Sequence, residues 1–401
     1  MITFDDIRAA RERIAGAVFY SPCPPSIALS EISGMQIYCK LDNLQRTGSF
    51  KERGARNALA QLPDDQKKRG VTAASAGNHA QALAYQGHLL GIPATVVMPK
   101  FAPLIKITNC QKLGANVILH GKDFAEAKAH ACALAAEKGY AYIDGYDDPP
   151  IIAGQGTMGL EILEQVPDVD LVVVPVGGGG LIAGVSLAIK TLRRQTKIIA
   201  VEAENVASFS AALKAAKPTP IKTHPTLADG LAIPQVGDNA FAIARDHVDL
   251  AITVSEEEIA LAILRLIELE KSVVEGAAAT ALAAAMSEKL KQFAGKKCVL
   301  LLCGGNIDPN ILSRVIERGL VADGRLCRFT AVISDRPGGL ADLAREIAAT
   351  GASIKQVVHE RAFGSADVST VNVLCTVETR NHQHVAELRA HLKSRGVQTH
   401  D

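Results

Sequence analysis

The sequence contains no tryptophan, and aromatic residues make up only 4% of its 401 positions. It also has no apolar run of the about 20 residues that a membrane-spanning helix requires. Its first residues, MITFDDIRAARERI, lack the charged-then-apolar order of a signal peptide. These absences give no reason to expect a membrane-bound or exported protein.

An excess of charge of one sign is also missing. Lys and Arg number 43 and Asp and Glu number 42, which leaves a formal net charge of +1. A nearly neutral chain has no electrostatic reason to bind nucleic acid or an acidic membrane surface. We therefore expect a small molecule, rather than either polyanion, as its partner.

The eight cysteines form no CxxC pair and no disulfide-like framework. We interpret them as the reduced thiols of a cytoplasmic protein. The histidines, including His382 and His384, do not show metal-binding spacing. No metal site is expected.

Between about Ile37 and Cys303, short β-branched runs alternate with longer helical patterns. The predicted strands are IYCKLDNL, VTAAS, ATVVMP, ANVILH, LVVVPVG, IIAVE and CVLLLCGG, and the clearest helices are HAQALAYQGHLLG, KDFAEAKAHACALAAEKG and LIAGVSLAIKTLRR. This alternation predicts an α/β fold with parallel strands and ligand sites at their carboxyl ends.

The last part of the chain follows another pattern. FTAVISDR, SIKQVVHE, STVNVLCTVE and VQTH predict strands, and PGGLADLAREIAATG and NHQHVAELRAHLKSRG predict helices. Their order is βαββαβ, that of a small ferredoxin-like module. We therefore expect one main domain over residues 1–320, a linker over 321–327 and a separate module over 328–401.

Four consecutive glycines, Gly177–Gly180, lie between a predicted strand and a predicted helix. Glycines permit positive φ and let backbone N–H groups converge on an anion at a helix N-terminus. A tight strand-to-helix turn is the alternative, although such a turn rarely needs four glycines. The run is neither a Walker A loop nor a GxGxxG fingerprint, so it indicates phosphate binding without naming the ligand.

Lys51 stands in the stretch TGSFKERGA, beside Phe50 and small residues. Taken alone it could form a surface salt bridge. A lysine in a desolvated pocket can instead lose its proton and form a Schiff base with an aldehyde. Combined with a phosphate loop on the same scaffold, Lys51 points to pyridoxal 5'-phosphate, an aldehyde that carries a phosphate.

Two further motifs follow predicted strands. SAGNHAQALAY, from Ser75, opens a helix and could hold a substrate carboxylate with hydroxyl, amide and N–H donors, or it could be an ordinary helix cap. CGGNID, from Cys303, could be a turn with a buried thiol or could place a neutral thiol beside the pyridine nitrogen of the cofactor.

Five motifs together carry a family resemblance. SFKERGA, SAGNHAQ, the AGQGT of residues 153–157, GGGGLIAG and CGGNID occur in the order and approximate spacing of the fold-type II pyridoxal-phosphate enzymes. Residues 1–320 resemble the serine/threonine ammonia-lyases, also called threonine dehydratases. The resemblance implies a two-subdomain, tryptophan synthase β-like fold whose smaller subdomain, about residues 45–145, is inserted in the larger.

The resemblance also implies a role for each motif residue. Lys51 would form the internal aldimine and later remove the α-proton, Phe50 would pack on the cofactor ring, and Asn78 would bind the pyridine 3'-oxygen. Cys303 would face the pyridine nitrogen. The phosphate loop would be Gly177, Gly178, Gly179, Gly180 and Leu181, and the carboxylate loop would be Ser75, Ala76, Gly77 and His79.

The implied reaction is an α,β-elimination by a carbon–nitrogen lyase. L-Threonine would give 2-oxobutanoate and ammonia, and L-serine would give pyruvate. A serine racemase or a hydroxyaspartate ammonia-lyase is the alternative on this scaffold, and a β-replacement synthase or a degenerate amino-acid sensor is less favoured.

Three positions bear on these alternatives. Serine racemases carry a catalytic serine where this chain has Ala76, so efficient racemisation is not expected. They also bind a divalent cation with an acid that corresponds to Ser208, although Glu202 is kept. Glu275 could lie near the cofactor or could cap a helix.

The tail, with SDRPGGLADLAREIAATGASI, is similar to an ACT domain, a regulatory module that binds amino acids between copies. The turn Asp335–Gly339 would meet the carboxylate of an effector, and isoleucine or valine would be natural feedback effectors. A dimerisation module that has lost its ligand is the alternative. The resemblance implies a homodimer or homotetramer.

Overall fold

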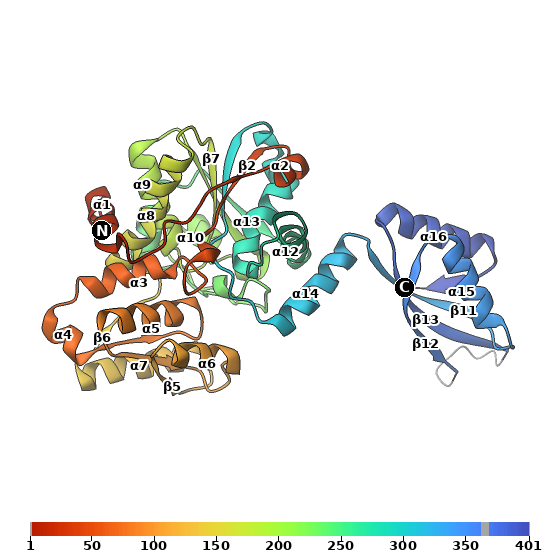
Figure 1. Cartoon of the computed structure of the whole chain (residues 1–401), viewed down its shortest axis with the longest axis horizontal. Coiled ribbons are helices and arrows are strands. Elements are labelled where there is room, and N and C mark those ends of the chain that lie inside the picture. The colour runs from red at the N-terminus through yellow and green to blue at the C-terminus, as the bar shows by residue number, and fades with distance from the viewer. Residues whose placement is uncertain (1, 362–368, 401) are drawn as a thin grey trace. The chain divides into compact units, whose positions relative to one another are not determined.

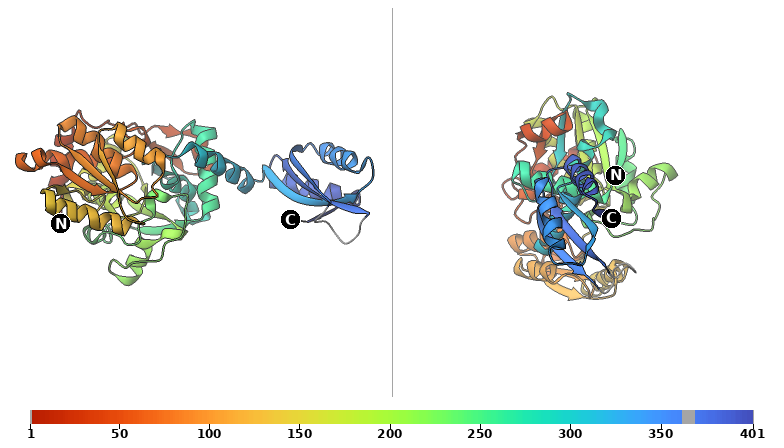
Figure 2. Two further views of the ribbon diagram at one scale, coloured as in Figure 1. Left: turned by 90° about the horizontal axis from the view of Figure 1, so that it is seen from below. Right: turned by 90° about the vertical axis from the view of Figure 1, so that its right-hand side faces the viewer.

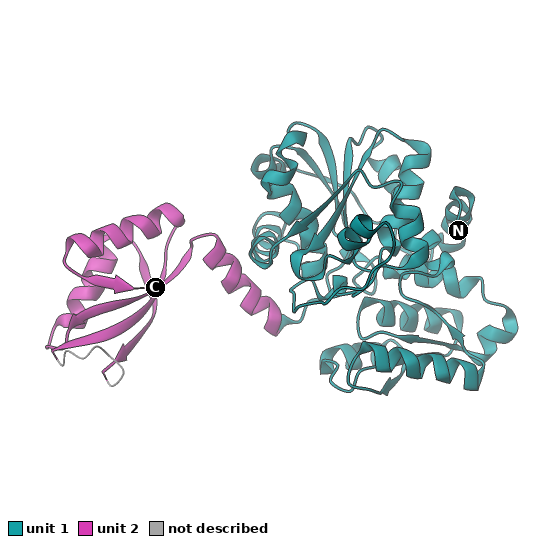
Figure 3. Ribbon diagram, turned by 180° about the vertical axis from the view of Figure 1, so that it is seen from behind, with its two compact units in different colours: residues 1–309 teal, residues 310–401 magenta. Residues whose placement is uncertain are grey.

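The computed structural model describes residues 2–361 and 369–400 (Figure 1). The chain divides into two compact units, Met1–Pro309 and Asn310–Asp401 (Figure 3). Residues 321–327, which were expected to form a linker, include the end of helix α14 (Pro309–Ala322) and the start of strand β11 (Leu326–Ser334). In the part of the chain that the structure describes, no helix has the length and apolar character needed to cross a bilayer.

The first unit contains a six-stranded sheet of order β1-β2-β10-β7-β8-β9. All neighbouring strands are parallel except the pair β1–β2. The bounds are β1 (Pro25–Ser26), β2 (Gln36–Lys40), β7 (Leu171–Pro175), β8 (Lys197–Ala203), β9 (Leu250–Val254) and β10 (Lys297–Leu301). Every residue of β7 is buried, as expected for a central parallel strand covered on both faces.

A second, four-stranded parallel sheet of order β5-β4-β3-β6 is inserted in the chain between β2 and β7 (Figure 2). Its strands are β3 (Val71–Ala74), β4 (Ala94–Met98), β5 (Asn116–Leu119) and β6 (Ala141–Tyr142). The strands expected at VTAAS, ATVVMP and ANVILH are therefore confirmed. The strands β1, β6 and β9 were not predicted.

Helices connect the strands throughout this unit. Their bounds are α1 (Phe4–Ile14), α2 (Ile27–Ser33), α3 (Lys51–Ala60), α4 (Asp64–Arg69), α5 (Asn78–Leu90), α6 (Leu104–Lys112), α7 (Phe124–Lys138), α8 (Pro149–Gln165), α9 (Gly180–Leu192), α10 (Ser208–Ala215), α11 (Asp238–Ala244), α12 (Glu256–Glu270) and α13 (Gly276–Met286), with 3-10 turns η1 (Asp42–Leu44), η2 (Glu204–Val206), η3 (Asp229–Leu231) and η4 (Glu288–Phe293). The predicted βα alternation is confirmed.

Glycine allows three of these helices to pack closely. A Cβ on Gly154 of α8 would lie 2.6 Å from the carbonyl oxygen of Arg53 in α3, and one on Gly184 of α9 would lie 2.3 Å from the carbonyl oxygen of Ile152. Both distances are too short for any side chain. The glycines of this Gly-rich sequence thus allow close contact between α8 and α3, the helix that begins at Lys51, and between α9 and α8.

A fully buried charge cluster also ties α3 to the large sheet. The Arg53 guanidinium, 0% exposed, binds Asp42 at 2.7 Å and Glu161 at 2.6 Å. Lys40 binds Glu161 at 2.5 Å and Ser21 O at 2.6 Å. Two cations face two carboxylates, so each buried charge is compensated.

In the second unit, α14 is followed by β11, α15 (Gly339–Ala349), β12 (Ser353–Glu360), β13 (Thr370–Glu378), α16 (His382–Ser394) and β14 (Gln398–His400). The strands form an antiparallel sheet of order β12-β13-β11-β14. One apolar cluster, which includes Phe329, Leu343 and Leu388, fills the space between helices and sheet. The predicted βαββαβ order is confirmed.

Candidate active site

Two motifs that are about 250 residues apart in sequence meet at the carboxyl end of the large sheet. The backbone N–H of Phe50 donates to the carbonyl oxygen of Cys303 at 3.0 Å, and Ser49 forms a β-bridge with Gly304. Lys51 is the first residue of α3. The end of β10 therefore fixes the backbone that carries Lys51.

The side chain of Lys51 is turned into the protein. Its Nζ donates to the carbonyl oxygen of Gly145 at 2.5 Å and lies 5.2 Å from the centroid of the Phe50 ring. Burial lowers the pKa of Lys51 to about 8, although Asp144, Cys303 and Glu275 act in the opposite direction. An amine with this pKa is partly neutral near pH 8, as a nucleophile or a base requires. Lys51 is no surface salt-bridge residue.

The glycine loop follows β7 and opens α9. All four glycines are buried, and Gly179, the N-cap of α9, has a φ of +93°. A Cβ on Gly178 would lie 2.2 Å from the Tyr146 ring, and one on Gly180 would lie 2.2 Å from the Tyr146 carbonyl oxygen. The loop therefore presents backbone at a helix N-terminus, where the first N–H groups lack intrahelical acceptors.

Tyr146 connects this loop to Lys51. It follows Gly145, the residue whose carbonyl accepts from Lys51, and its own ring covers Gly178. The Asp144 carboxylate fixes this turn by accepting from the N–H groups of Tyr146 and Asp147, both at 3.0 Å. Sequence reasoning missed this turn, although the stretch DGYDDP has the composition of a tight loop.

The segment Ser75–His79 lies at the N-terminus of α5. The N-cap is Gly77, which has no side chain to cap the helix, and Ser75 Oγ accepts from the Gly77 N–H at 3.2 Å. The alternative that Ser75 or Asn78 is an ordinary helix cap is therefore wrong. The uncapped N–H groups of the first turn suit a carboxylate.

The His79 side chain is buried and contacts the backbone at Ile143, just before the turn that Asp144 fixes. Its Nε2 lies 3.1 Å from the carbonyl oxygen of Ile143, so Nε2 carries the proton and donates. Burial and, to a smaller extent, the charge of Lys51 lower the pKa of His79 to about 4. The ring is neutral near pH 7, and only the backbone N–H of His79 remains to serve a carboxylate.

Asn78 is held by two neighbours. Its Nδ2 donates to Glu275 Oε1 at 2.8 Å and Oε2 at 3.0 Å, and its Oδ1 accepts from Asn306 Nδ2 at 2.8 Å. Glu275 is the N-cap residue of α13, but its side chain makes no cap hydrogen bond. Of the two alternatives for Glu275, the helix cap is therefore met in position only, because the side chain binds Asn78 instead of the first turn of α13. Asn306 was missed as a site residue, although it stands inside the motif CGGNID.

Cys303 is 2% exposed. Burial raises its pKa well above the ordinary value, and Glu275 and Asp42 raise it further. Its thiol is therefore neutral at physiological pH, as the sequence interpretation required.

The Glu202 carboxylate binds the first residues of helix α10. It accepts from the N–H groups of Phe209 at 2.6 Å and Ser210 at 2.8 Å, and from Ser210 Oγ at 2.6 Å. Ser208, the position compared with a second acid, is fully buried. Within residues 2–361 and 369–400, no cluster of three or more His, Cys, Asp or Glu side chains could hold a metal ion.

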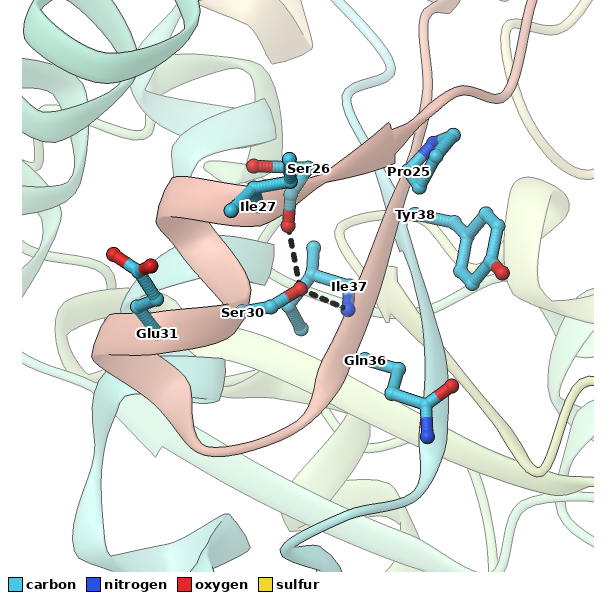
Figure 4. A pocket seen from close by; sticks show the side chains of 8 residues that line it. All are labelled: Pro25, Ser26, Ile27, Ser30, Glu31, Gln36, Ile37 and Tyr38. Carbon is cyan, nitrogen blue, oxygen red and sulfur yellow. Dashed lines mark hydrogen bonds between the residues drawn. The ribbon is translucent and has the colours of Figure 1, made fainter.

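A separate surface pocket of about 450 Å³ lies where β1, α2 and β2 meet (Figure 4). It is lined by Pro25, Ser26, Ile27, Ser30, Glu31, Gln36, Ile37 and Tyr38. It contains none of the residues that surround Lys51.

The residues around Lys51 fit pyridoxal phosphate. A buried amine with a lowered pKa and a glycine loop at a helix N-terminus are joined through Gly145 and Tyr146. The side-chain oxygen of Ser49, two residues before Lys51, is buried without a hydrogen-bond partner among the described residues. Most buried polar groups in proteins are hydrogen-bonded, so an unsatisfied one indicates that a polar ligand can bind there.

Comparisons with known proteins agree with this geometry. Residues 14–304 match the family of pyridoxal-phosphate dependent enzymes. The chain is 44% identical over 398 residues to an L-threonine ammonia-lyase of Thermotoga maritima, covering 99% of each chain. Among solved structures, it resembles the processed threonine deaminase isoform 2 of Solanum lycopersicum, with a TM-score of 0.75, 37% identity and coverage of 79% of this chain and 86% of that one. It also resembles a serine racemase of Dictyostelium discoideum, with a TM-score of 0.73, 34% identity and coverage of 77% and 99%.

Proposed function

Because the chain belongs to the pyridoxal-phosphate-dependent enzyme family, we propose that it is a threonine ammonia-lyase. It converts L-threonine into 2-oxobutanoate and ammonia, and L-serine into pyruvate and ammonia. The observation that carries this proposal is the contact chain from Lys51 through Gly145 and Tyr146 to Gly178, which supports a reactive amine and a phosphate loop within one site.

In the proposed mechanism, bound pyridoxal phosphate supplies a conjugated electron sink for negative charge at the substrate Cα. Lys51 takes the proton from Cα, because its amine is partly neutral near physiological pH. The C–O bond at Cβ would then break, and the hydroxide would leave as water with the proton that Lys51 holds. Water hydrolyses the released enamine to the 2-oxo acid and ammonia.

The other residues bind and orient. The N–H groups of the glycine loop, with Leu181 behind them, would hold the phosphate. Asn78 would donate to the 3'-oxygen of the cofactor, Phe50 would pack on its ring, and Cys303 would present a neutral thiol to its ring nitrogen. The backbone of Ser75–His79 holds the substrate carboxylate.

The charges around the site favour a neutral substrate side chain. Lys106 pairs with Asp229 at 2.7 Å, and Arg53 is bound by Asp42 and Glu161. A hydroxyaspartate lyase would need a cation available for the second carboxylate of its substrate. Threonine and serine make no such demand.

Serine racemase is the second candidate, because a solved racemase shares the fold. Racemisation requires a group that delivers a proton to the face of Cα opposite Lys51. Ala76 carries no exchangeable proton on its side chain. The elimination reaction therefore fits this chain better.

For the second unit, we propose an ACT-like regulatory role. The turn Asp335–Gly339 enters α15, Gly338 has a φ of +99°, and Arg361 binds Asp335 at 3.0 Å. N–H groups at this turn suit the carboxylate of an amino acid such as isoleucine or valine. A dimerisation module without a ligand is the alternative, and titration of the full chain with both amino acids decides between them.

We further propose a cytoplasmic homodimer or homotetramer. Each of the eight cysteines is present as a free thiol, which suits a reducing compartment.

One experiment tests the enzymatic proposal directly. The purified chain, loaded with pyridoxal phosphate, is mixed with L-threonine and the 2-oxo acid is measured; borohydride reduction and mass spectrometry then locate the cofactor. We expect 2-oxobutanoate and a label on Lys51. A label on another residue, or a protein that releases no 2-oxo acid from either substrate, would contradict the proposal.

A further inference from the structure

Glu275 lies at a junction of three separate segments. Its backbone N–H donates to the carbonyl oxygen of Gly304 at 3.0 Å. A Cβ on Gly304 would lie 2.1 Å from Glu275 Oε1, so the carboxylate rests directly on the loop that follows Cys303. From there it accepts from Asn78, the first residue of α5.

The opposite end of the Asn78 amide is also fixed. Asn306 Nδ2 donates both to Asn78 Oδ1 at 2.8 Å and to the carbonyl oxygen of Thr47 at 2.7 Å. Asn306 is itself confined, because a Cβ on Gly48 would lie 2.6 Å from its Oδ1. An amide can turn over and exchange its donor and acceptor ends. With Asn306 on one end and Glu275 on the other, the Asn78 amide keeps its donor end next to Glu275.

Glu275 is 5% exposed, and several charged or titratable groups act on it. Its pKa is raised to about 7, chiefly by burial and also by Asp229, against the opposing effects of Asn78, Lys106 and the backbone N–H of Asn306. Lys51 and Cys303 also lie within its electrostatic reach, since Glu275 raises the pKa of each. The carboxyl group thus exchanges its proton in the physiological range.

We propose that Glu275 is a positioning residue: its carboxylate, acting with Asn306, holds the donor end of the Asn78 amide in the orientation that the cofactor requires. This inference rests on the proposed function, because it takes pyridoxal phosphate as the ligand of Asn78. Nδ2 carries two protons, so it can donate to Glu275 and to a ligand oxygen together. A protonated Glu275 is a weaker acceptor and leaves only Asn306 to fix the orientation of the amide.

The consequence is a link between proton binding and cofactor binding. Below pH 7 the apoprotein carries a proton on Glu275, and this proton must leave before the amide is fixed. Cofactor affinity therefore falls as the pH drops through 7, in addition to the effect of Lys51, which must also be neutral to react. One linked proton changes the dissociation constant about tenfold per pH unit.

The test measures the dissociation constant of pyridoxal phosphate from the full-length apoprotein by absorbance between pH 6 and 9. Glu275→Gln keeps the size of the side chain and an acceptor oxygen. Below pH 7, we expect its slope of log Kd against pH to be smaller than that of the wild type by about one, because one linked proton is removed. Glu202→Gln is the matched control, since it neutralises another buried carboxylate that touches neither Asn78 nor Lys51; its slope should equal that of the wild type.

A wild-type slope in Glu275→Gln would overturn the inference. Asn306→Ala is the second variant and keeps Glu275; we expect at least fivefold weaker cofactor binding at every pH with the wild-type slope. Should Glu275→Gln not fold, wild-type affinity in Asn306→Ala would overturn the inference and the expected loss would support it. A wild-type protein that binds no pyridoxal phosphate would instead refute the proposed function.

Discussion

The backbone N–H of Phe50 donates a hydrogen bond to the backbone carbonyl of Cys303 over 3.0 Å. This bond ties the start of α3 to the segment that follows β10. The backbone of Lys51, the next residue, is therefore fixed, and its side chain reaches the carbonyl oxygen of Gly145. Lys51 is therefore placed by the sheet rather than by a flexible loop. The first two predictions follow from that placement.

Replacement of Lys51 by alanine should abolish covalent cofactor attachment and the absorption band of the bound cofactor. The rate of 2-oxobutanoate release should fall by more than about 10²-fold, because a positioned proton-transfer group is lost. Lys67→Ala, on the surface helix α4, is the matched control and should keep wild-type activity. A Lys51→Ala protein that retains the band would place the attachment elsewhere.

Uptake of the cofactor by apoprotein should depend on pH through Lys51. Burial lowers its pKa to about 8, and only the neutral amine attacks an aldehyde. The uptake rate should therefore rise as the pH increases through about 8 and level off above it. Stopped-flow absorbance at constant ionic strength measures this profile. A midpoint near 10.5, the value of an exposed lysine, would show that the amine is not desolvated.

A methyl group on Gly178 should disturb the phosphate loop. The Cβ would lie 2.2 Å from the Tyr146 ring, and overpacking of this kind costs about 1–3 kcal/mol. We expect Gly178→Ala to bind pyridoxal phosphate more weakly than the wild type. The double variant Gly178→Ala/Tyr146→Ser removes the clashing ring and should regain part of the affinity. Equal affinity in the single and double variants would disprove the role of this contact.

Ala76 should limit the chain to elimination. Incubation with L-serine should yield pyruvate and little D-serine, because Ala76 has no proton to deliver to the opposite face of Cα. Ala76→Ser should raise the ratio of D-serine to pyruvate. Chiral chromatography measures both products in one sample. Appreciable D-serine from the wild-type chain would show that another residue supplies that proton.

The buried charge cluster should matter for stability. Arg53→Met leaves the carboxylates of Asp42 and Glu161 without their guanidinium, and removal of one partner of a buried ion pair costs about 3–5 kcal/mol. Arg8→Met breaks only the exposed pair with Asp5, which contributes about 1 kcal/mol or less. Chemical unfolding of both variants compares these losses. Equal losses would mean that the cluster is not a stabilising unit.

Much of the fold could be predicted from local patterns. Strands such as Leu171–Pro175 are continuous apolar runs, and the helices between them are amphipathic or bounded by glycine. These are properties of neighbouring residues, and they decide secondary structure without reference to distant parts of the chain. The edge strand Leu250–Val254 and the two-residue β6 were not predicted, because pairing with β8 and β3, rather than a marked pattern in their own sequences, defines them.

By itself, the sequence predicted which groups carry the chemistry: Lys51, the glycine run Gly177–Gly180, the thiol of Cys303 and the segment Ser75–His79 at the start of a helix. Only the tertiary structure decided how they are arranged. In the folded chain, Lys51 donates to the carbonyl oxygen of Gly145 and the Tyr146 ring lies against Gly178. The Glu275 carboxylate accepts from Asn78 and does not cap the helix that Glu275 precedes. Such contacts join residues from 32 to 197 positions apart, and hydrogen-bond geometry and burial at that separation exist only in the folded chain.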